Sequence, residues 1–230
     1  MRLILNADDL GLSDAVNAAI DDAWSRGLVT DASLLATGPA FDDAVRRWRG
    51  REVGVHLDIA EFPPLTGWSG PRNEAALSIG RAHLPALVAE FEGQVRRVRA
   101  TGLQVTHLDS HQHLHWVPVV AAAVREVRRR TDVLGVRGMG ALPGVRLRRR
   151  AHAAAYNGRL RAAGATVPAQ FGPAATVLEA LHGGWRAPTV EAMLHPGGPG
   201  EPRYQEELDE VARTDWRAMG VSLVRWSGVG

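Results

Sequence analysis

The stretch Thr106-His107-Leu108-Asp109-Ser110-His111-Gln112-His113-Leu114-His115 places four of the chain's nine histidines beside an aspartate. The apolar run Leu103-Gln104-Val105 comes directly before it and is typical of a buried strand. Pro118, just after it, opens a helical pattern. Imidazoles at the exit of a strand, beside a carboxylate, are the ligands that a borderline divalent metal ion takes. The stretch therefore predicts a strand–helix unit with a metal site at the strand end.

Outward from this unit, short apolar strands alternate with amphipathic helices. This alternation predicts an α/β fold of parallel strands joined by right-handed crossovers. A chain of 230 residues fits one such domain, residues 1–230. The predicted strands are residues 3–5, 33–36, 52–57, 103–105, 133–137, 190–195 and 221–224, with helices that begin near Ser13, Phe41, Pro85, Pro118 and Tyr204.

Two regions depart from this alternation. Residues 60–82 are rich in proline and glycine and are predicted to form an irregular excursion, which in a compact domain is usually functional or mobile. Residues 141–175 show no clear periodicity. The arginines between Arg146 and Arg161 lie among alanines with few aromatic residues, so a solvated helix face is the better interpretation than a nucleic-acid site.

Composition excludes several classes of chemistry. The chain has no cysteine, so a metal must be held by histidine and carboxylate. All 27 basic residues are arginine, yet the formal net charge is only +2, which gives no reason to expect an acidic partner. No segment has the roughly 20 apolar residues that span a bilayer. No signal-peptide core follows Met1, so we expect a cytoplasmic protein without membrane or nucleic-acid partners.

Polar side chains follow most of the predicted strands. The carboxyl ends of parallel strands meet on one face, where α/β proteins build their sites. Side chains far apart in the sequence are therefore expected to converge there. These residues are Asp8, Asp9, His56, His111, Arg137 and His195.

One carboxylate and two imidazoles match a catalytic metal site, which commonly has three protein ligands and one open position. The ion would activate water and polarise a carbonyl, a second carboxylate would accept the water's proton, and a histidine would protonate the leaving nitrogen. Adjacent Asp8 and Asp9 suit the two carboxylate roles. Strand alternation would point them to opposite sides, so this division needs a local turn.

Four motifs in order along the chain carry a resemblance to a known family. They are Asn6-Ala7-Asp8-Asp9-Leu10-Gly11, Gly54-Val55-His56-Leu57, the stretch Thr106–His115, and His195-Pro196-Gly197. With them the chain resembles the YdjC/ChbG-type carbohydrate deacetylases. The resemblance implies an irregular, TIM-like barrel of about seven parallel strands. It also implies removal of N-acetyl groups from amino sugars such as chitooligosaccharides.

The resemblance further implies a role for each matched residue. Asp9, His56 and His111 would bind one divalent metal ion, with Zn²⁺ favoured by the donor set and Mg²⁺, Mn²⁺, Co²⁺ and Ni²⁺ left open. Asp8 would be the general base and His195 the general acid. The partner would be a small N-acetylated sugar, and a homo-oligomer is possible in principle. The segment 58–61 is more acidic than in many relatives, which leaves the sugar specificity open.

Other polar residues near these motifs have alternative interpretations. In an extended chain His111, His113 and His115 share one face, whereas in a helix only His111 and His115 do. We predict that His113 contacts substrate. Asp109 is a candidate to orient a ligand histidine through its second ring nitrogen. Arg137 is predicted to contact substrate, with a salt-bridged strand end as the alternative.

Two other functions fit parts of this pattern. A phosphoesterase or amidohydrolase-type barrel would also use a metal, but such barrels commonly open with His-x-His, where this chain has Asp8-Asp9. A non-catalytic sugar-binding protein is the second alternative. The presence of candidate ligands, base and acid together counts against it.

Overall fold

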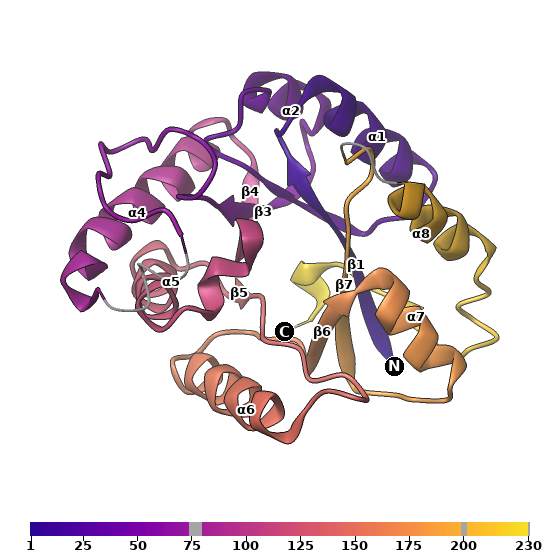
Figure 1. Cartoon of the computed structure of the whole chain (residues 1–230). Coiled ribbons are helices and arrows are strands. Elements are labelled where there is room, and N and C mark those ends of the chain that lie inside the picture. The colour runs from indigo at the N-terminus through magenta and orange to yellow at the C-terminus, as the bar shows by residue number, and fades with distance from the viewer. Residues whose placement is uncertain (74–79, 199–201, 230) are drawn as a thin grey trace. The chain divides into compact units, whose positions relative to one another are not determined.

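The computed structural model of the chain describes residues 1–73, 80–198 and 202–229, so residues 74–79 of the predicted 60–82 excursion lie outside the described residues. The chain divides into two compact units, which we describe one at a time. The first contains Met1–Asp8, Ala18–Ala32 and Gly135–Gly230, and the second contains Asp9–Asn17 and Ser33–Leu134. The elements are labelled in Figure 1.

In the first unit a parallel sheet forms around the opening strand. β1 (Arg2–Leu10) pairs with β7 (Thr189–Leu194) from Arg2↔Thr189 to Ala7↔Leu194. The central residues Leu3 and Ile4 are fully buried, as expected of a parallel strand covered on both faces. The unit also contains β5 (Gly135–Val136), α6 (Leu147–Ala162), β6 (Gln170–Pro173), α7 (Ala174–His182), α8 (Pro202–Arg213), β8 (Ser222–Leu223) and the 3-10 turn η3 (Trp226–Gly228).

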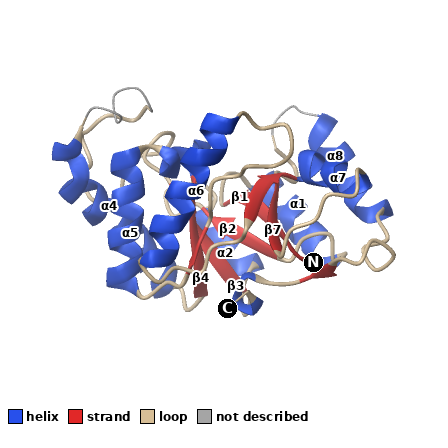
Figure 2. Cartoon of the chain, turned by 90° about the horizontal axis from the view of Figure 1, so that it is seen from below, coloured by secondary structure: helices blue, strands red, loops and turns tan. Residues whose placement is uncertain are grey.

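The remaining strands of this unit extend the same sheet. β6 pairs with β7 in parallel, and β8 pairs with the first residues of β1. α7 begins directly after Pro173 and lies beside β6 (Figure 1). Figure 2 shows β1 and β7 as neighbouring red strands. The carboxyl ends of β1 and β7 therefore point the same way, with Leu194 paired to Ala7.

The second unit is built on two closely paired strands. β3 (Glu52–Leu57) pairs in parallel with β4 (Gln104–Ser110), with a register shift between Val53 and Gly54. A Cβ on Gly54 would lie 2.3 Å from Nε2 of His107, so only glycine fits there. The unit also contains α2 (Phe41–Arg47), η1 (Arg81–His83), α4 (Leu84–Ala100), η2 (His111–Trp116) and α5 (Pro118–Thr131), and it shares α1 (Asp14–Ser25) and β2 (Asp31–Leu34) with the first unit.

Helices α4 and α5 pack side by side in this unit (Figures 1 and 2). Their buried faces are the apolar stripes that the sequence predicts, with Phe91 and Val95 in α4 and Val120 and Val124 in α5. In the part of the chain that is described, no helix combines the length and apolarity needed to cross a membrane.

The predicted order of parallel strands and helices is confirmed, with several corrections. β4 runs to Ser110, past the predicted strand end at Val105, so Asp109 lies inside the strand. β1 runs to Leu10, so Asp8 and Asp9 lie inside the strand rather than after it. Residues 141–175, for which no elements were predicted, contain α6 and β6 and reach into α7. The helix predicted near Tyr204, whose apolar positions extend in the sequence to Met219, is α8, which ends at Arg213.

The region 141–175 resisted prediction for a physical reason. Over its 16 residues α6 buries only Ala153, Tyr156, Asn157 and Leu160, too few apolar side chains to give a clear helical period. Its arginines, among them Arg148 and Arg159, are exposed to solvent, as expected from the sequence.

Candidate metal centre

Asp9, the next-to-last residue of β1, has a left-handed backbone conformation at which a turn begins. Its φ is +66°, in the left-handed region that few non-glycine residues adopt. The Asp9 carbonyl accepts a hydrogen bond from Leu12 N at 3.0 Å, and Gly11 follows with a φ of +97°. The Asn17 side chain accepts a hydrogen bond from Gly11 N at 2.6 Å, which fixes the turn. The sequence prediction requires a local turn here, because in a regular strand Asp8 and Asp9 would point to opposite sides. The left-handed backbone of Asp9 provides that turn.

His56 lies near the end of β3 and is almost completely buried. The β3–β4 register places it opposite Asp109, and His56 Nδ1 lies 2.9 Å from Asp109 Oδ1. Ser33 Oγ donates to the other oxygen of Asp109 at 2.7 Å. The predicted contact of Asp109 with a candidate ligand histidine is therefore observed, whereas metal binding by His56 stays a prediction. The opposite nitrogen, Nε2 of His56, lies 3.3 Å from Asp9 Oδ1.

His111 begins η2, directly after β4, and closes the cluster. Its Nδ1 lies 2.9 Å from Asp9 Oδ1, and its Nε2 lies 2.6 Å from a carboxylate oxygen of Glu61. The rings of His56 and His111 meet edge to face, with their centroids 5.5 Å apart.

Asp9, His56 and His111 together offer three candidate ligand atoms within 4.8 Å of one another. Two imidazole nitrogens that both face one carboxylate oxygen form the donor set of a three-ligand zinc site, so the residues fit a divalent ion. Asp9 lies in β1, His56 lies in β3 and His111 follows β4, so the structure brings these three predicted residues together.

The two charged partners in this cluster shift each other's pKa. Burial opposes the ionisation of Asp9, but hydrogen bonds from His111 and His56 outweigh it and hold the pKa of Asp9 far below its usual range. Burial also disfavours protonated His111, but the hydrogen bond to Asp9 outweighs this and raises the pKa of His111 above that of free histidine.

These shifts predict how metal affinity depends on pH. A metal ion needs an unprotonated imidazole nitrogen, so it competes with the proton that Asp9 helps His111 to retain. Because the pKa of His111 is raised, we expect Zn²⁺ affinity to fall about tenfold per pH unit below that pKa, for one proton displaced. Asp9 stays ionised over this range and adds no dependence of its own.

Isothermal titration calorimetry in two buffers of different ionisation enthalpy measures this proton release. We expect about one proton per ion at a pH below the raised pKa of His111 and fewer at a pH above it. His152→Ala, an exposed histidine of α6, is the control and should leave the release unchanged. Affinity that does not change between these two pH values would contradict the prediction.

The other histidines of the stretch Thr106–His115 do not belong to the cluster of Asp9, His56 and His111. Gln112 and His113 have left-handed backbones, with φ values of +53° and +55°, so the segment is neither the strand nor the helix considered above. The ring of His113 stacks on Trp116 at 4.9 Å. His115 is buried, and its Nδ1 lies 2.7 Å from Ser110 Oγ. Substrate contact by His113 stays a prediction.

Asp8 belongs to a buried ionic cluster in the first unit. Arg137 binds it with two hydrogen bonds, Nη1 to Oδ2 at 2.7 Å and Nη2 to Oδ1 at 2.6 Å. Arg137 also contacts Glu191 Oε1, with Nε at 2.8 Å, and Asn6 Nδ2 donates to Asp8 Oδ1 at 2.8 Å. All four side chains are at least 99% buried. The salt-bridged alternative for Arg137 is thus observed, whereas its contact with substrate stays a prediction.

His195 follows β7 in the same unit. Its ring packs against Tyr204 of α8 with 5.1 Å between centroids, and its side chain is partly exposed. The sequence alone did not identify Glu191 or Glu61. The signal for Glu191 was an acidic residue inside an apolar strand, and the signal for Glu61 was the acidic segment 58–61.

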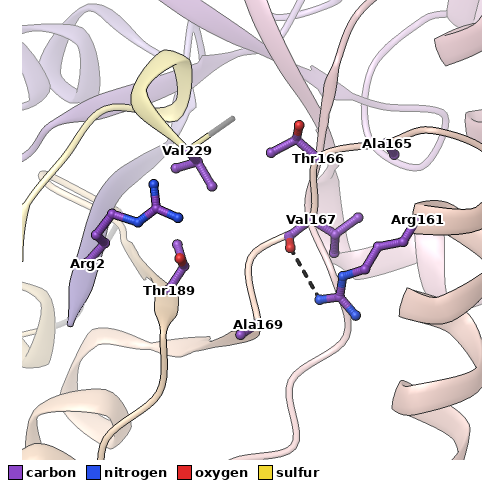
Figure 3. A pocket seen from close by; sticks show the side chains of 8 residues that line it. All are labelled: Arg2, Arg161, Ala165, Thr166, Val167, Ala169, Thr189 and Val229. Atoms are coloured by element: carbon purple, nitrogen blue, oxygen red, sulfur yellow. Dashed lines mark hydrogen bonds between the residues drawn. The ribbon is translucent and has the colours of Figure 1, made fainter.

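The first unit also contains a shallow pocket of about 510 Å³ at the amino ends of β1 and β7 (Figure 3). Arg2 and Thr189, the first residues of these strands, line it. Arg161 donates to the carbonyl oxygen of Val167 at its edge, as the dashed line shows. The predicted site residues of this unit, Asp8, Arg137 and His195, lie toward the carboxyl ends of the strands. None of them lines the pocket.

Three comparisons relate the chain to known proteins. The chain is 34% identical to a carbohydrate deacetylase of Halalkalibacterium halodurans over 140 residues, which cover 54% of this chain and 59% of that protein. It is 37% identical to a chitooligosaccharide deacetylase of Klebsiella pneumoniae over 140 residues, which cover 54% of this chain and 56% of the relative. The match spans less than two thirds of either relative's length.

A crystal structure from Enterococcus faecalis V583, of a protein assigned provisionally to cellobiose-phosphate cleavage, superimposes with a TM-score of 0.74 at 20% identity. It covers 100% of this chain and 98% of the other, which confirms the predicted TIM-like α/β fold class. The family model described as YdjC-like protein matches residues 2–222. Because this match spans nearly the whole sequence, the chain belongs to the YdjC-like protein family.

Proposed function

We propose that this chain is a metal-dependent N-deacetylase that hydrolyses the acetamide of a small N-acetylated amino sugar or glycoconjugate. The observation that supports the proposal most is the cluster of Asp9, His56 and His111, whose donor atoms lie within 4.8 Å of one another. The names of the two bacterial deacetylases support the choice of substrate class.

In this proposal Asp9 Oδ1, His56 Nε2 and His111 Nδ1 hold the ion. When bound, the ion supplies Lewis acidity, which activates water and polarises an amide carbonyl. Asp109 fixes the ring of His56 through the 2.9 Å hydrogen bond at Nδ1 and leaves Nε2 free for the ion.

Asp8 accepts the proton of the attacking water in the proposed reaction. Its carboxylate is held in one orientation by both Nη atoms of Arg137 and by Asn6, and charge-assisted bonds of this geometry leave little rotational freedom. Oδ1 accepts two of these hydrogen bonds, from Arg137 Nη2 and Asn6 Nδ2, and Oδ2 accepts one, from Arg137 Nη1, so in the proposed reaction Oδ2 takes the proton. Arg137 thereby orients the base.

His195 donates a proton to the leaving amine nitrogen. The packing of its ring on Tyr204 restricts its rotation while a partly exposed edge stays open to a ligand. His113, stacked on Trp116, is proposed to contact the sugar. Amide hydrolysis needs a base that removes a proton from water and an acid that delivers a proton to the leaving nitrogen. In this proposal two different residues, Asp8 and His195, have these roles.

Acetate release from N-acetylglucosamine oligomers tests the proposal. We expect release by the Zn²⁺-loaded protein, loss on chelation, and recovery on addition of Zn²⁺. Asp8→Asn should lower kcat by about 10²–10⁴-fold, the range for loss of a general base. Because Asp8 also pairs with Arg137, the thermal unfolding of the variant must be measured alongside.

Glu126→Gln on the surface of α5 is the matched control, since it removes a carboxylate far from any predicted role, and it should keep full activity. Acetate release that survives both chelation and Asp8→Asn would sink the proposed mechanism. Faster turnover of a phosphate ester than of any acetamide would favour the phosphoesterase alternative. Sugar binding without acetate production, with metal bound, would favour a non-catalytic role.

A further inference from the structure

A carboxylate faces the outer nitrogen of each candidate histidine ligand. Asp109 faces Nδ1 of His56 at 2.9 Å, and Glu61 faces Nε2 of His111 at 2.6 Å. The nitrogens that remain, His56 Nε2 and His111 Nδ1, are the two that face Asp9 Oδ1. Glu61 therefore contacts His111 as Asp109 contacts His56. The contact is at Nε2 in His111 and at Nδ1 in His56.

The backbone around Glu61 is held in place by the buried side chain of Asp58. One carboxylate oxygen of Asp58, Oδ1, accepts hydrogen bonds from the backbone nitrogens of Ala60 and Glu61, at 2.7 and 3.0 Å. The other oxygen accepts one from Phe62 N at 3.0 Å. Asp58 is itself 0% exposed. The position of Glu61 is therefore set by a buried anchor directly before it.

A second buried acid holds the far end of the same segment. Glu90 of α4, also 0% exposed, accepts hydrogen bonds from Leu65 N at 3.0 Å and from Thr66 N at 2.8 Å. The two residues in between, Pro63 and Pro64, have no N–H group to donate. Every backbone N–H from residue 60 to 66 thus goes to a buried carboxylate.

We infer that Glu61 is a positioning residue for His111. It accepts the Nε2 proton of the imidazole, so the lone pair of Nδ1 faces Asp9 Oδ1 and His56 Nε2, where a divalent ion binds. A carboxylate in this position fixes both the ring orientation and the tautomer of a ligand histidine. The inference rests on the metal site of the proposed function and adds to it the residue that selects the ligating nitrogen.

The test measures Zn²⁺ affinity by calorimetry in wild-type protein, Glu61→Ala and Glu61→Gln. We expect Glu61→Ala to weaken binding about 10–100-fold, the range for loss of such an outer partner. Glu61→Gln should recover part of this loss, because its amide oxygen still accepts the Nε2 proton. The Glu61 side chain is 43% exposed, so all three proteins are expected to fold and to unfold at similar temperatures.

Glu92→Ala is the matched control. This glutamate lies in the same unit, pairs with the surface residues Arg96 and Arg130, and its replacement should leave Zn²⁺ affinity unchanged. Histidine-labelled ¹⁵N spectra supply a readout that a merely structural role would not move. In Zn²⁺-loaded wild type we expect His111 to be bound through Nδ1 and protonated at Nε2, and Glu61→Ala to lose this single signature.

Failure of this inference and of the proposed function are distinguishable. If wild type binds Zn²⁺ and Glu61→Ala binds it equally well, or if His111 ligates through Nε2, the role of Glu61 is overturned while the metal site stands. If wild type binds no divalent ion at all, the metal site is overturned and the role of Glu61 falls with it.

Discussion

Replacement of His56 by alanine is expected to abolish specific Zn²⁺ binding. In the proposed deacetylase reaction it is expected to lower kcat/KM by about 10³-fold or more, because a catalytic ion supplies several kcal/mol of transition-state stabilisation. His56 is the most buried of the three candidate ligands. Its Nε2 is 3.3 Å from Asp9 Oδ1, so its loss removes one of the three candidate ligand atoms from the cluster.

The loss must be separated from misfolding, because His56→Ala also leaves buried Asp109 without its histidine partner. Ser33 still donates to Asp109, and His56→Asn, whose side-chain amide can donate to the same oxygen, is the milder variant. Both should bind no Zn²⁺ by calorimetry while near-ultraviolet circular dichroism reports an intact fold. His152→Ala on the exposed face of α6 is the control. Wild-type metal affinity in His56→Asn would refute the assignment of this ligand.

Arg137→Ala is expected to give the largest loss of stability, about 3–5 kcal/mol in the free energy of unfolding, the cost of removing one partner from a buried ion cluster. Without the guanidinium, Asp8 and Glu191 would be two buried carboxylates with no cation between them. Arg137→Lys should recover only part of the loss, because an ammonium cannot form the paired contacts with Asp8.

Chemical denaturation monitored by tryptophan fluorescence measures the effect. Arg129→Ala is the matched control, since it removes a guanidinium from the exposed pair with Glu126 and should cause no measurable change. If Arg137→Ala unfolds at the wild-type denaturant concentration, the cluster around Asp8 is not the buried ionic network described above.

The sequence predicted those parts of the fold whose residues repeat with a clear period. The valine stripe of α5, with Val120, Val124 and Val127, identified that helix and its buried face. β6 was missed because Gln170–Pro173 has four residues, ends in proline and shows no alternation. α7 starts at once after it, without a polar cap or a loop to mark the change.

Within the site, the sequence predicted that Asp109 faces a ring nitrogen of a candidate ligand histidine, but it could not say which histidine. Asp109 lies opposite His56 because β3 and β4 are parallel neighbours and β4 runs on to Ser110, beyond the predicted strand end at Val105. The left-handed turn at Asp9 could only be stated as a requirement, since no local pattern shows the Asn17 side chain that fixes it. Glu61 and Glu191 gained roles through contacts with residues 50 and 54 positions away, which one sequence cannot reveal.

The anchoring of residues 60–66 also bears on which substitutions this segment tolerates. Asp58 and Glu90 hold its backbone through main-chain amides. Among its side chains, the Thr66 hydroxyl also donates to Glu90, and Glu61 contacts His111. Substitutions at the other positions are therefore expected to leave the path of the backbone, and with it the place of Glu61, unchanged.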